Sequence, residues 1–220
     1  MNSPLKSNFR DWTLDKIEEV FGLEQIDTLP TLSNWLQFQY EIDAYEKRYL
    51  TSLAKNYTSF GGDDWNEIEL ENKIISPIIV FSQMDNKQFA YFLERELSCV
   101  IGDHELSGKV DGMIATGFRN PKKPYFCLNE YKRGTDPNGD PRGQALIAML
   151  VAQHLNPDEN PIFGCYIIGR IWYFMVLVGN EYAISKDYSC ADDEILDIYR
   201  ILKGLRFYID NLLSHERNQQ

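Results

Sequence analysis

Two stretches of the sequence decide the fold: residues 106–116, LSGKVDGMIAT, and residues 125–132, YFCLNEYK. Both are rich in β-branched and aromatic residues and are bounded by turn-forming residues, which is the pattern of β-strands. Both also carry charges inside the predicted strand, namely Asp111 in the first and Glu130 and Lys132 in the second. Because side chains alternate between the faces of a strand, Glu130 and Lys132 are expected on one face. Charges within apolar strands are costly to bury without partners, so this pattern indicates a site.

A metal ion would satisfy these charges. If the two strands are antiparallel neighbours, Asp111 and Glu130 come side by side, and two carboxylates at that distance require a cation between them or a shared proton. Oxygen ligands favour Mg²⁺ or Mn²⁺ over zinc. A Glu-x-Lys pair by itself is also typical of an exposed ion pair on a strand. The aspartate on the preceding strand and the apolar flanks favour the metal site.

Upstream of these strands the sequence predicts helices. The first sixty residues carry a wide apolar stripe at helical period, with Ser33 as a cap, and a turn-rich break follows at residues 57–64. A second helix, capped by Asp64, runs through NEIELENKIIS until Pro77, which must kink it or open a new turn. A strand over residues 89–100 then precedes the two quoted stretches.

Downstream, helices and strands alternate. The predicted elements are a helix over 143–154, strands over 162–168 and 171–178 joined by a Gly169-Arg170 turn, and a helix over 191–213. Strands interleaved with helices predict an α/β fold, a mixed central β-sheet flanked by helices. Residues 1–62 are expected to form an N-terminal helical extension that packs on a core formed by residues 63–220.

The charge balance argues against binding nucleic acid by electrostatics alone. The chain of 220 residues has a net charge of −11 and a pI near 4.8, whereas proteins that wrap nucleic acid are usually basic. Residues 105–145 nevertheless contain seven basic and five acidic residues, a net +2 that leaves −13 for the remainder. A nucleic acid would therefore meet a local basic rim, aided by a homodimer or a partner subunit, or it would bind weakly.

The remaining composition excludes several classes of protein. The four cysteines lack the close spacing of zinc or redox motifs, and the three histidines are dispersed. The N-terminus lacks an apolar signal stretch, and the longest apolar run, residues 171–178, is too short to cross a bilayer. These features predict a soluble, cytoplasmic protein without membrane contact.

With these residues in place, the sequence resembles a known family. VDG at 110–112, CLNEYK at 127–132, and a loop followed by a helix that opens with Gln144 resemble the PD-(D/E)XK nuclease superfamily, also called restriction-endonuclease-like. The resemblance covers about residues 65–178. The stretch NEIELENKIISPII is similar to the glutamate-bearing helix before the nuclease core of type I and type III restriction subunits, and Glu67 matches its first acid. Where some relatives have proline before the core acid, this chain has Val110.

The resemblance implies a Mg²⁺- or Mn²⁺-dependent nuclease, most plausibly acting on DNA. It implies that Asp111 and Glu130 bind the metal and that the Tyr131 carbonyl completes the shell. Glu67 would bind the metal directly or through water. Glu71, one helical turn further on the same face, is the alternative helix ligand.

The same resemblance assigns two further roles. Lys132 would orient and help deprotonate the attacking water, and Gln144 would hold that lysine or a phosphate. Two alternatives stay open, because a fold does not fix a function. The chain could be a non-catalytic subunit or interaction module of this fold, or a phosphoesterase that acts on a smaller substrate.

Overall fold

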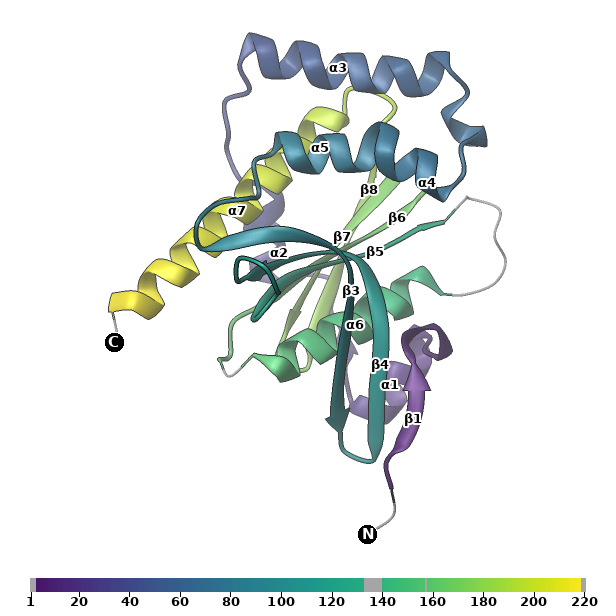
Figure 1. Cartoon of the computed structure of the whole chain (residues 1–220), viewed down its shortest axis with the longest axis vertical. Coiled ribbons are helices and arrows are strands. Elements are labelled where there is room, and N and C mark those ends of the chain that lie inside the picture. The colour runs from purple at the N-terminus through teal and green to yellow at the C-terminus, as the bar shows by residue number, and fades with distance from the viewer. Residues whose placement is uncertain (1–2, 133–139, 157, 219–220) are drawn as a thin grey trace.

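The computed structural model describes residues 3–132, 140–156 and 158–218, with the backbone alone described for residues 128–132 and 215–218. Within these ranges the chain forms a mixed eight-stranded sheet with helices on both faces (Figure 1). The strands are β1 (Leu5–Asn8), β2 (Glu24–Gln25), β3 (Phe89–Ile101), β4 (His104–Thr116), β5 (Pro124–Lys132), β6 (Ile162–Ile168), β7 (Ile171–Val178) and β8 (Glu181–Ser189). The α-helices are α1 (Leu14–Phe21), α2 (Pro30–Leu36), α3 (Ala44–Ser59), α4 (Glu67–Leu70), α5 (Ser76–Phe81), α6 (Pro141–Leu155) and α7 (Ile195–Asn218). Short helical segments complete the set: 3₁₀ turns η1 (Phe9–Asp11) and η2 (Gly62–Asp64), and the π-helical η3 (Glu71–Ile75).

The sheet has the order β1-β4-β5-β6-β7-β8-β2, and β3 pairs with β4 outside this path. The strand β4 is antiparallel to both of its neighbours β3 and β5, whereas β6 runs parallel to β5 after the crossover helix α6. The strands β7 and β8 continue the sheet as an antiparallel meander. The predicted α/β class with a mixed sheet is therefore confirmed.

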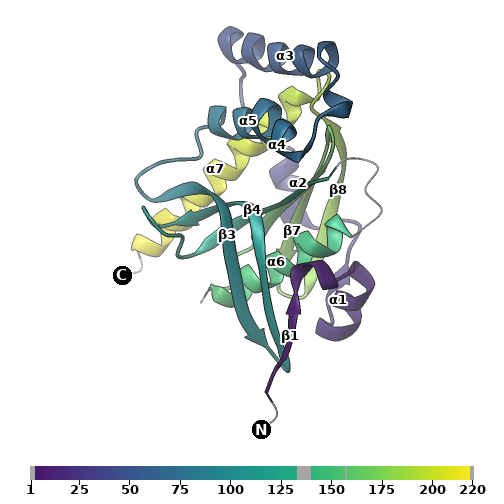
Figure 2. The same ribbon diagram turned by 45° about the vertical axis from the view of Figure 1, so that its right-hand side comes forward.

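Two apolar cores fill the space between sheet and helices. One face of the sheet packs against α6 and α1, and the other packs against α2, α3, α5 and α7 (Figures 1 and 2). The five consecutive residues 145–149 of α6 are all fully buried, because this helix lies between the sheet on one side and the N-terminal residues on the other. On the opposite face, the buried Trp35 donates a hydrogen bond from Nε1 to the Ile201 carbonyl (2.7 Å) and joins α2 to α7.

The prediction that the first sixty residues are helical is wrong in two places. Both β1 and β2 come from this region, and they pair in parallel with β4 and β8. Strands of four and two residues are too short to show a period of two. The helix predicted from Ser33 is also divided, since α2 ends at Leu36 and α3 begins only after Asp43, whose carboxylate caps it by accepting from the amides of Tyr45 and Glu46.

Further along the chain, the elements differ from the sequence expectations at their ends. Asp64 does not cap the second helix; Asn66 does, and its side chain accepts from the Glu69 amide (3.0 Å). The new turn expected at Pro77 is confirmed, since α4 passes into the π-helical η3 and α5 begins with Pro77 in its first turn. The strand β8 was not predicted, and the last helix begins at Ile195 rather than at 191.

The central elements agree with the sequence predictions. The strands predicted at 162–168 and 171–178 are confirmed, and β3, β4, β5 and α6 begin and end within two residues of the expected positions. Three of the cysteines, Cys127, Cys165 and Cys190, are buried free thiols. In the described part of the chain, no helix combines the length and apolarity needed to cross a membrane.

Candidate functional site

Two strands, β1 and β5, pair with different parts of the same edge of β4. The strand β3 pairs along the other edge over its whole length, from His104 to Thr116. On the divided edge, β1 pairs with residues 104–107 and β5 pairs with residues 112–115. Residues 108–111 therefore lie between the two partners, and we call this opening the fork.

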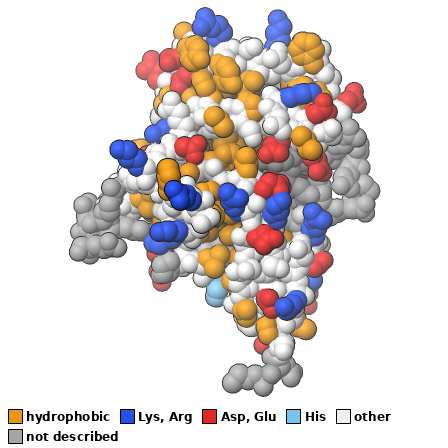
Figure 3. Space-filling model, in the orientation of Figure 1, with side chains coloured by type: hydrophobic (Ala, Val, Ile, Leu, Met, Phe, Trp, Pro, Cys, Tyr) orange, Lys and Arg blue, Asp and Glu red, His pale blue; other side chains and the backbone are white. Residues whose placement is uncertain are grey.

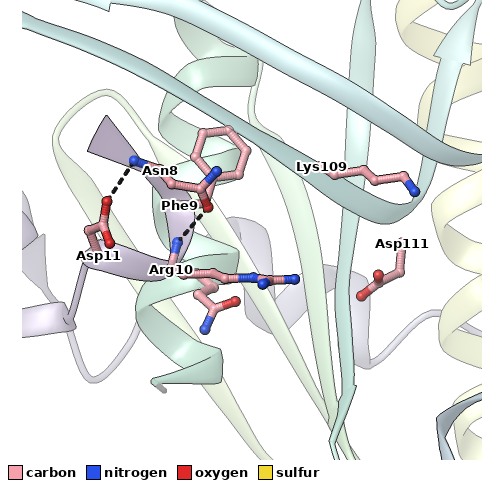
Figure 4. A pocket seen from close by; sticks show the side chains of 7 residues that line it. Asn8, Phe9, Arg10, Asp11, Lys109 and Asp111 are labelled. Carbon is pink, nitrogen blue, oxygen red and sulfur yellow. Dashed lines mark hydrogen bonds between the residues drawn. The ribbon is translucent and has the colours of Figure 1, made fainter. Parts of the chain in front are cut away.

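A pocket of about 380 Å³ occupies the fork. It is lined by side chains from three parts of the chain: Asn8, Phe9, Arg10 and Asp11 from the N-terminal residues, Lys109 and Asp111 from β4, and Gln144 from α6. Figure 4 shows the side chains of Arg10 and Asp111 extending toward each other, with the Lys109 side chain above them. Two bases, two acids and two side-chain amides therefore line one opening in the sheet.

Two of the predicted site residues line this pocket. Asp111 is half-buried in it. Gln144 lies in the first turn and a half of α6, is 7% exposed, and donates its backbone amide to the Asp140 carbonyl (2.9 Å). The sequence separates these two residues by a strand, a loop and a helix start, and the fold brings them together.

The backbone opposite Asp111 is unusual. Leu93 pairs with Gly112 and Arg95 pairs with Val110, so Glu94 lies opposite Asp111 in the register. Glu94 has a φ of 54°, a left-handed conformation in the middle of a strand. Such conformations cost about 1–3 kcal/mol in non-glycine residues and cluster at functional sites.

The same position interrupts the alternation of β4. Leu106 and Val110 contribute to the core on the α6 side of the sheet, and so do Met113 and Ala115. The positions of β4 that contribute to this core are thus even-numbered before Asp111 and odd-numbered after Gly112. The change of phase at the fork allows a charged residue to lie between two buried segments of one strand.

The strand β5 brings the remaining predicted core residues beside Asp111 in the register. The strands β4 and β5 are antiparallel neighbours, with Gly112 opposite Leu128. Asp111 lies one residue beyond this pair on β4, and Glu130 lies two residues beyond it on β5, in the same direction. The pairing of β5 with β6 shifts between Asn129 and Tyr131, so Glu130 occupies a bulge and regular alternation cannot be assumed there. The side chains of Glu130, Tyr131 and Lys132 lie outside the described residues.

The two predicted helix ligands, Glu67 and Glu71, do not line the pocket. Glu67 is the exposed first residue of α4, and Glu71 is the half-buried first residue of η3. The Glu71 amide donates to the Glu67 carbonyl, so the expected separation of one helical turn is present. The helix α4 contacts β5. Among the side chains that the structure describes, no three His, Cys, Asp or Glu residues are grouped closely enough to hold a metal ion, and the Glu130 carboxylate is outside that set.

Sequence reasoning missed the basic residues of the pocket. Lys109 lies two residues before Asp111 and forms an ion pair with Glu94. Arg10 lies a hundred residues away, and only the parallel pairing of β1 with β4 brings it to the fork. Close by, Tyr166 of β6 lies opposite Asn129 of β5. Burial raises the pKa of the Tyr166 phenol, so this hydroxyl keeps its proton at neutral pH.

Convergent acids and bases of this kind suit a ligand that carries negative charge together with a cation, such as a phosphate ester with a divalent metal. No family model matches the chain, and no curated protein matches it either.

Proposed function

We propose that this protein is a Mg²⁺- or Mn²⁺-dependent nuclease that hydrolyses phosphodiester bonds of DNA. The observation that carries the proposal is the position of Asp111. Its half-buried carboxylate lines a polar pocket, and the adjoining antiparallel strand leads directly to Glu130 and Lys132. Three residues expected to act together thus belong to two neighbouring strands at one opening of the sheet.

The order of the elements supports a restriction-endonuclease-like core. A helix (α5), three antiparallel strands (β3, β4 and β5), a helix (α6) and a parallel strand (β6) follow one another, as the resemblance to the PD-(D/E)XK superfamily led us to expect. The proposed site lies where β4 and β5 meet the start of α6. In this proposal Gln144, at that helix start, holds Lys132 or a phosphate oxygen.

The donor set fits a hard divalent cation. The carboxylate of Asp111, the acid at position 130 and the backbone carbonyl of Tyr131 are all oxygen donors, which Mg²⁺ and Mn²⁺ prefer. When bound, the metal would neutralise negative charge on the phosphate and so ease attack by water. Lys132 orients that water and assists the loss of its proton, and Glu67 or Glu71 contributes from the helix that contacts β5.

The surface around the fork supports contact with a polyanion, although the chain as a whole is acidic. Lys and Arg side chains cross the middle of the face shown in Figure 3, over β3 and β4, with acidic side chains between them. Exposed basic residues of the N-terminal residues, of β3 and β4 and of the loop after β4 include Arg10, Arg95, Lys109, Arg119 and Lys122. A nucleic-acid backbone could follow this row, because phosphate contacts need local positive charge rather than a positive net charge.

A cleavage assay tests the proposal. Linear, circular and single-stranded DNA are incubated with Mg²⁺ or Mn²⁺ and either the wild type or Lys132→Ala. We expect metal-dependent cutting by the wild type and a rate at least roughly 100-fold lower for the variant, since it loses the group that stabilises developing charge. Lys55→Ala is the matched control, because Lys55 is an exposed lysine on α3, away from the fork.

Other outcomes separate the alternatives. A folded wild type that neither cuts DNA nor binds Mn²⁺ would contradict the nuclease and favour a non-catalytic subunit. Metal binding without cutting would contradict DNA hydrolysis by the chain alone. It would direct attention to a partner subunit or to a smaller phosphodiester.

A further inference from the structure

The N-terminal arm, which we define as residues 5–13, is firmly attached to the fork. Its strand β1 pairs in parallel with β4 from Leu5 opposite His104 to Asn8 opposite Ser107. Phe9 is buried directly over Gly108, where an added Cβ would lie 2.3 Å from the Phe9 ring. Only glycine at position 108 permits this contact, and the contact fixes the turn that follows β1.

The end of the arm is fixed against α6. An added Cβ at Gly143 would lie 2.5 Å from the Trp12 carbonyl oxygen, so the arm and the first turn of α6 are in close backbone contact. The Asp140 carboxylate accepts the Arg142 amide of α6 (3.1 Å) and also the Leu14 amide of α1 (3.0 Å). These contacts leave little freedom in the position of the residue between Phe9 and Asp11.

That residue is Arg10. Its side chain is exposed and extends from η1 across the pocket toward Asp111 (Figure 4). Throughout the described ranges, its guanidinium has no ion-pair partner. The neighbouring charges differ in this respect, because Asp11 accepts the Asn8 amide (2.8 Å) in a capping box and Lys109 is paired with Glu94.

We propose that Arg10 binds a backbone phosphate of the DNA substrate. The inference rests on the proposed nuclease function and adds a residue from outside the region of resemblance, residues 65–178. A guanidinium presents several donors in a planar fork that matches two phosphate oxygens. Its position beside Asp111 places the bound phosphate next to the proposed metal ligands. The arm therefore completes the site from the far end of the chain.

Because the chain has a negative net charge, binding of DNA requires cationic side chains at the site itself. With −11 overall, the protein repels a polyanion at long range, and binding must depend on a few cations held in place at the site. Each phosphate contact that is lost should then remove a measurable part of both the affinity and its dependence on salt.

The test is DNA binding without turnover. Fluorescence anisotropy of a short labelled duplex is measured over a range of salt concentrations, with a chelator present, for wild type, Arg10→Ala, Arg10→Lys and Lys6→Ala. Lys6 is the matched control, because it is an exposed cation of the same arm that pairs with Glu105 outside the pocket. Thermal melting checks that each variant is folded.

We expect Arg10→Ala to weaken binding about tenfold and to lower the magnitude of the salt slope by about 1. Arg10→Lys should restore the slope but only part of the affinity, because lysine lacks the planar fork. Lys6→Ala should match the wild type.

Equal affinities and slopes for Arg10→Ala and Lys6→Ala would overturn the inference, and DNA cleavage by the wild type would still support the nuclease. Arg10-dependent binding by a wild type that never cuts DNA would support the phosphate site and contradict the nuclease. A wild type without salt-dependent binding to DNA would overturn both, and a clear preference for RNA of the same length would overturn DNA as the ligand.

Discussion

Two groups of charged side chains in this protein lie close together in different ways. One is the fork pocket. The other, which we call the Glu46 cluster, joins α3 to α7 and consists of Glu46, Tyr40, Tyr199 and Lys203. One Glu46 carboxylate oxygen accepts from the hydroxyls of Tyr40 and Tyr199, both at 2.7 Å. The Lys203 ammonium lies 4.0 Å from this oxygen and 5.2 Å from the centroids of both tyrosine rings.

The Glu46 cluster is closed. The side chains of Glu46 and Lys203 are only 12% and 10% exposed, and their charged atoms lie 4.0 Å apart. Burial raises the pKa of Tyr40 to about 12, and hydrogen bonding to Glu46 adds to this effect. Burial alone would raise the pKa of Glu46, but hydrogen bonds from Tyr199 and Tyr40 lower it. The charged groups satisfy one another, which is the arrangement of a structural contact.

The fork pocket is open by comparison. Arg10 and Lys109 are exposed, Asp111 is half-buried, and a volume of about 380 Å³ separates the side chains that line it. Charged side chains that lie close together, as in the Glu46 cluster, therefore do not by themselves indicate a functional site. The fork pocket differs in that its acids and bases line a space that can hold a ligand.

The largest effect is expected on activity, at the open site. Asp111→Asn should lower metal-dependent DNA cleavage roughly 100-fold or more, since the charge that holds the cation is removed. The free energy of unfolding should change little, because the side chain is half-exposed to the pocket. Cleavage rates and denaturant titrations of the same preparation check both parts. A large loss of stability with full activity would make this site resemble the closed cluster.

The corresponding change in the closed cluster should act on stability alone. Glu46→Ala leaves a buried ammonium and two phenols without their acceptor, and we expect a loss of about 3 kcal/mol in the free energy of unfolding. Cleavage per folded molecule should stay at the wild-type rate. Urea denaturation followed by tryptophan fluorescence measures the loss, and Glu41→Ala, an exposed acid before α3, is the control. A difference of less than about 0.5 kcal/mol between the two variants would contradict the structural role.

A third change tests whether the arm and α6 pack as a rigid unit. Gly143→Ala adds a methyl group 2.5 Å from the Trp12 carbonyl oxygen, and backbone on both sides prevents an easy adjustment. We expect a loss of about 2 kcal/mol and weaker DNA binding, because Arg10 moves with the arm. Gly143 has no positive φ, so its loss measures crowding, whereas Gly179→Ala measures the cost of a positive φ at a position where an added Cβ meets nothing within 4 Å.

The smallest effect is a pH dependence of the closed cluster. Because the folded pKa of Tyr40 is raised to about 12 from about 10 in the unfolded chain, the folded state holds this proton more tightly. Stability should therefore fall as the pH rises from about 10 to about 12. Tyr40→Phe should make this decline shallower in denaturant titrations at alkaline pH. An unchanged slope would show that the Tyr40 hydroxyl does not titrate with folding.

The sequence alone predicts the centre of this fold well and its edges poorly. The strands β4, β6 and β7 and the helix α6 are long enough for their hydrophobic period to be evident, and they lie where expected. The short strands β1 and β2 are defined by their pairing with β4 and β8, so no local sequence pattern predicts them.

The site divides in the same way. The charges of Asp111, Glu130 and Lys132 within apolar strands were visible in the sequence, and Asp111 and Gln144 do line one pocket. Arg10 was not predictable, because its place depends on a parallel pairing between residues a hundred positions apart. The left-handed Glu94 and the change of phase in β4 were not predicted either.

The double role of Asp140 has a consequence for local opening of the protein. One carboxylate accepts the first amides of both α1 and α6, so a displacement of Asp140 releases the arm and also uncaps the helix that carries Gln144. In native-state hydrogen exchange, the Leu14 and Arg142 amides should accordingly lose protection together, as one cooperative unit. A ligand held by Arg10 would slow exchange at both amides, even though neither of them touches it.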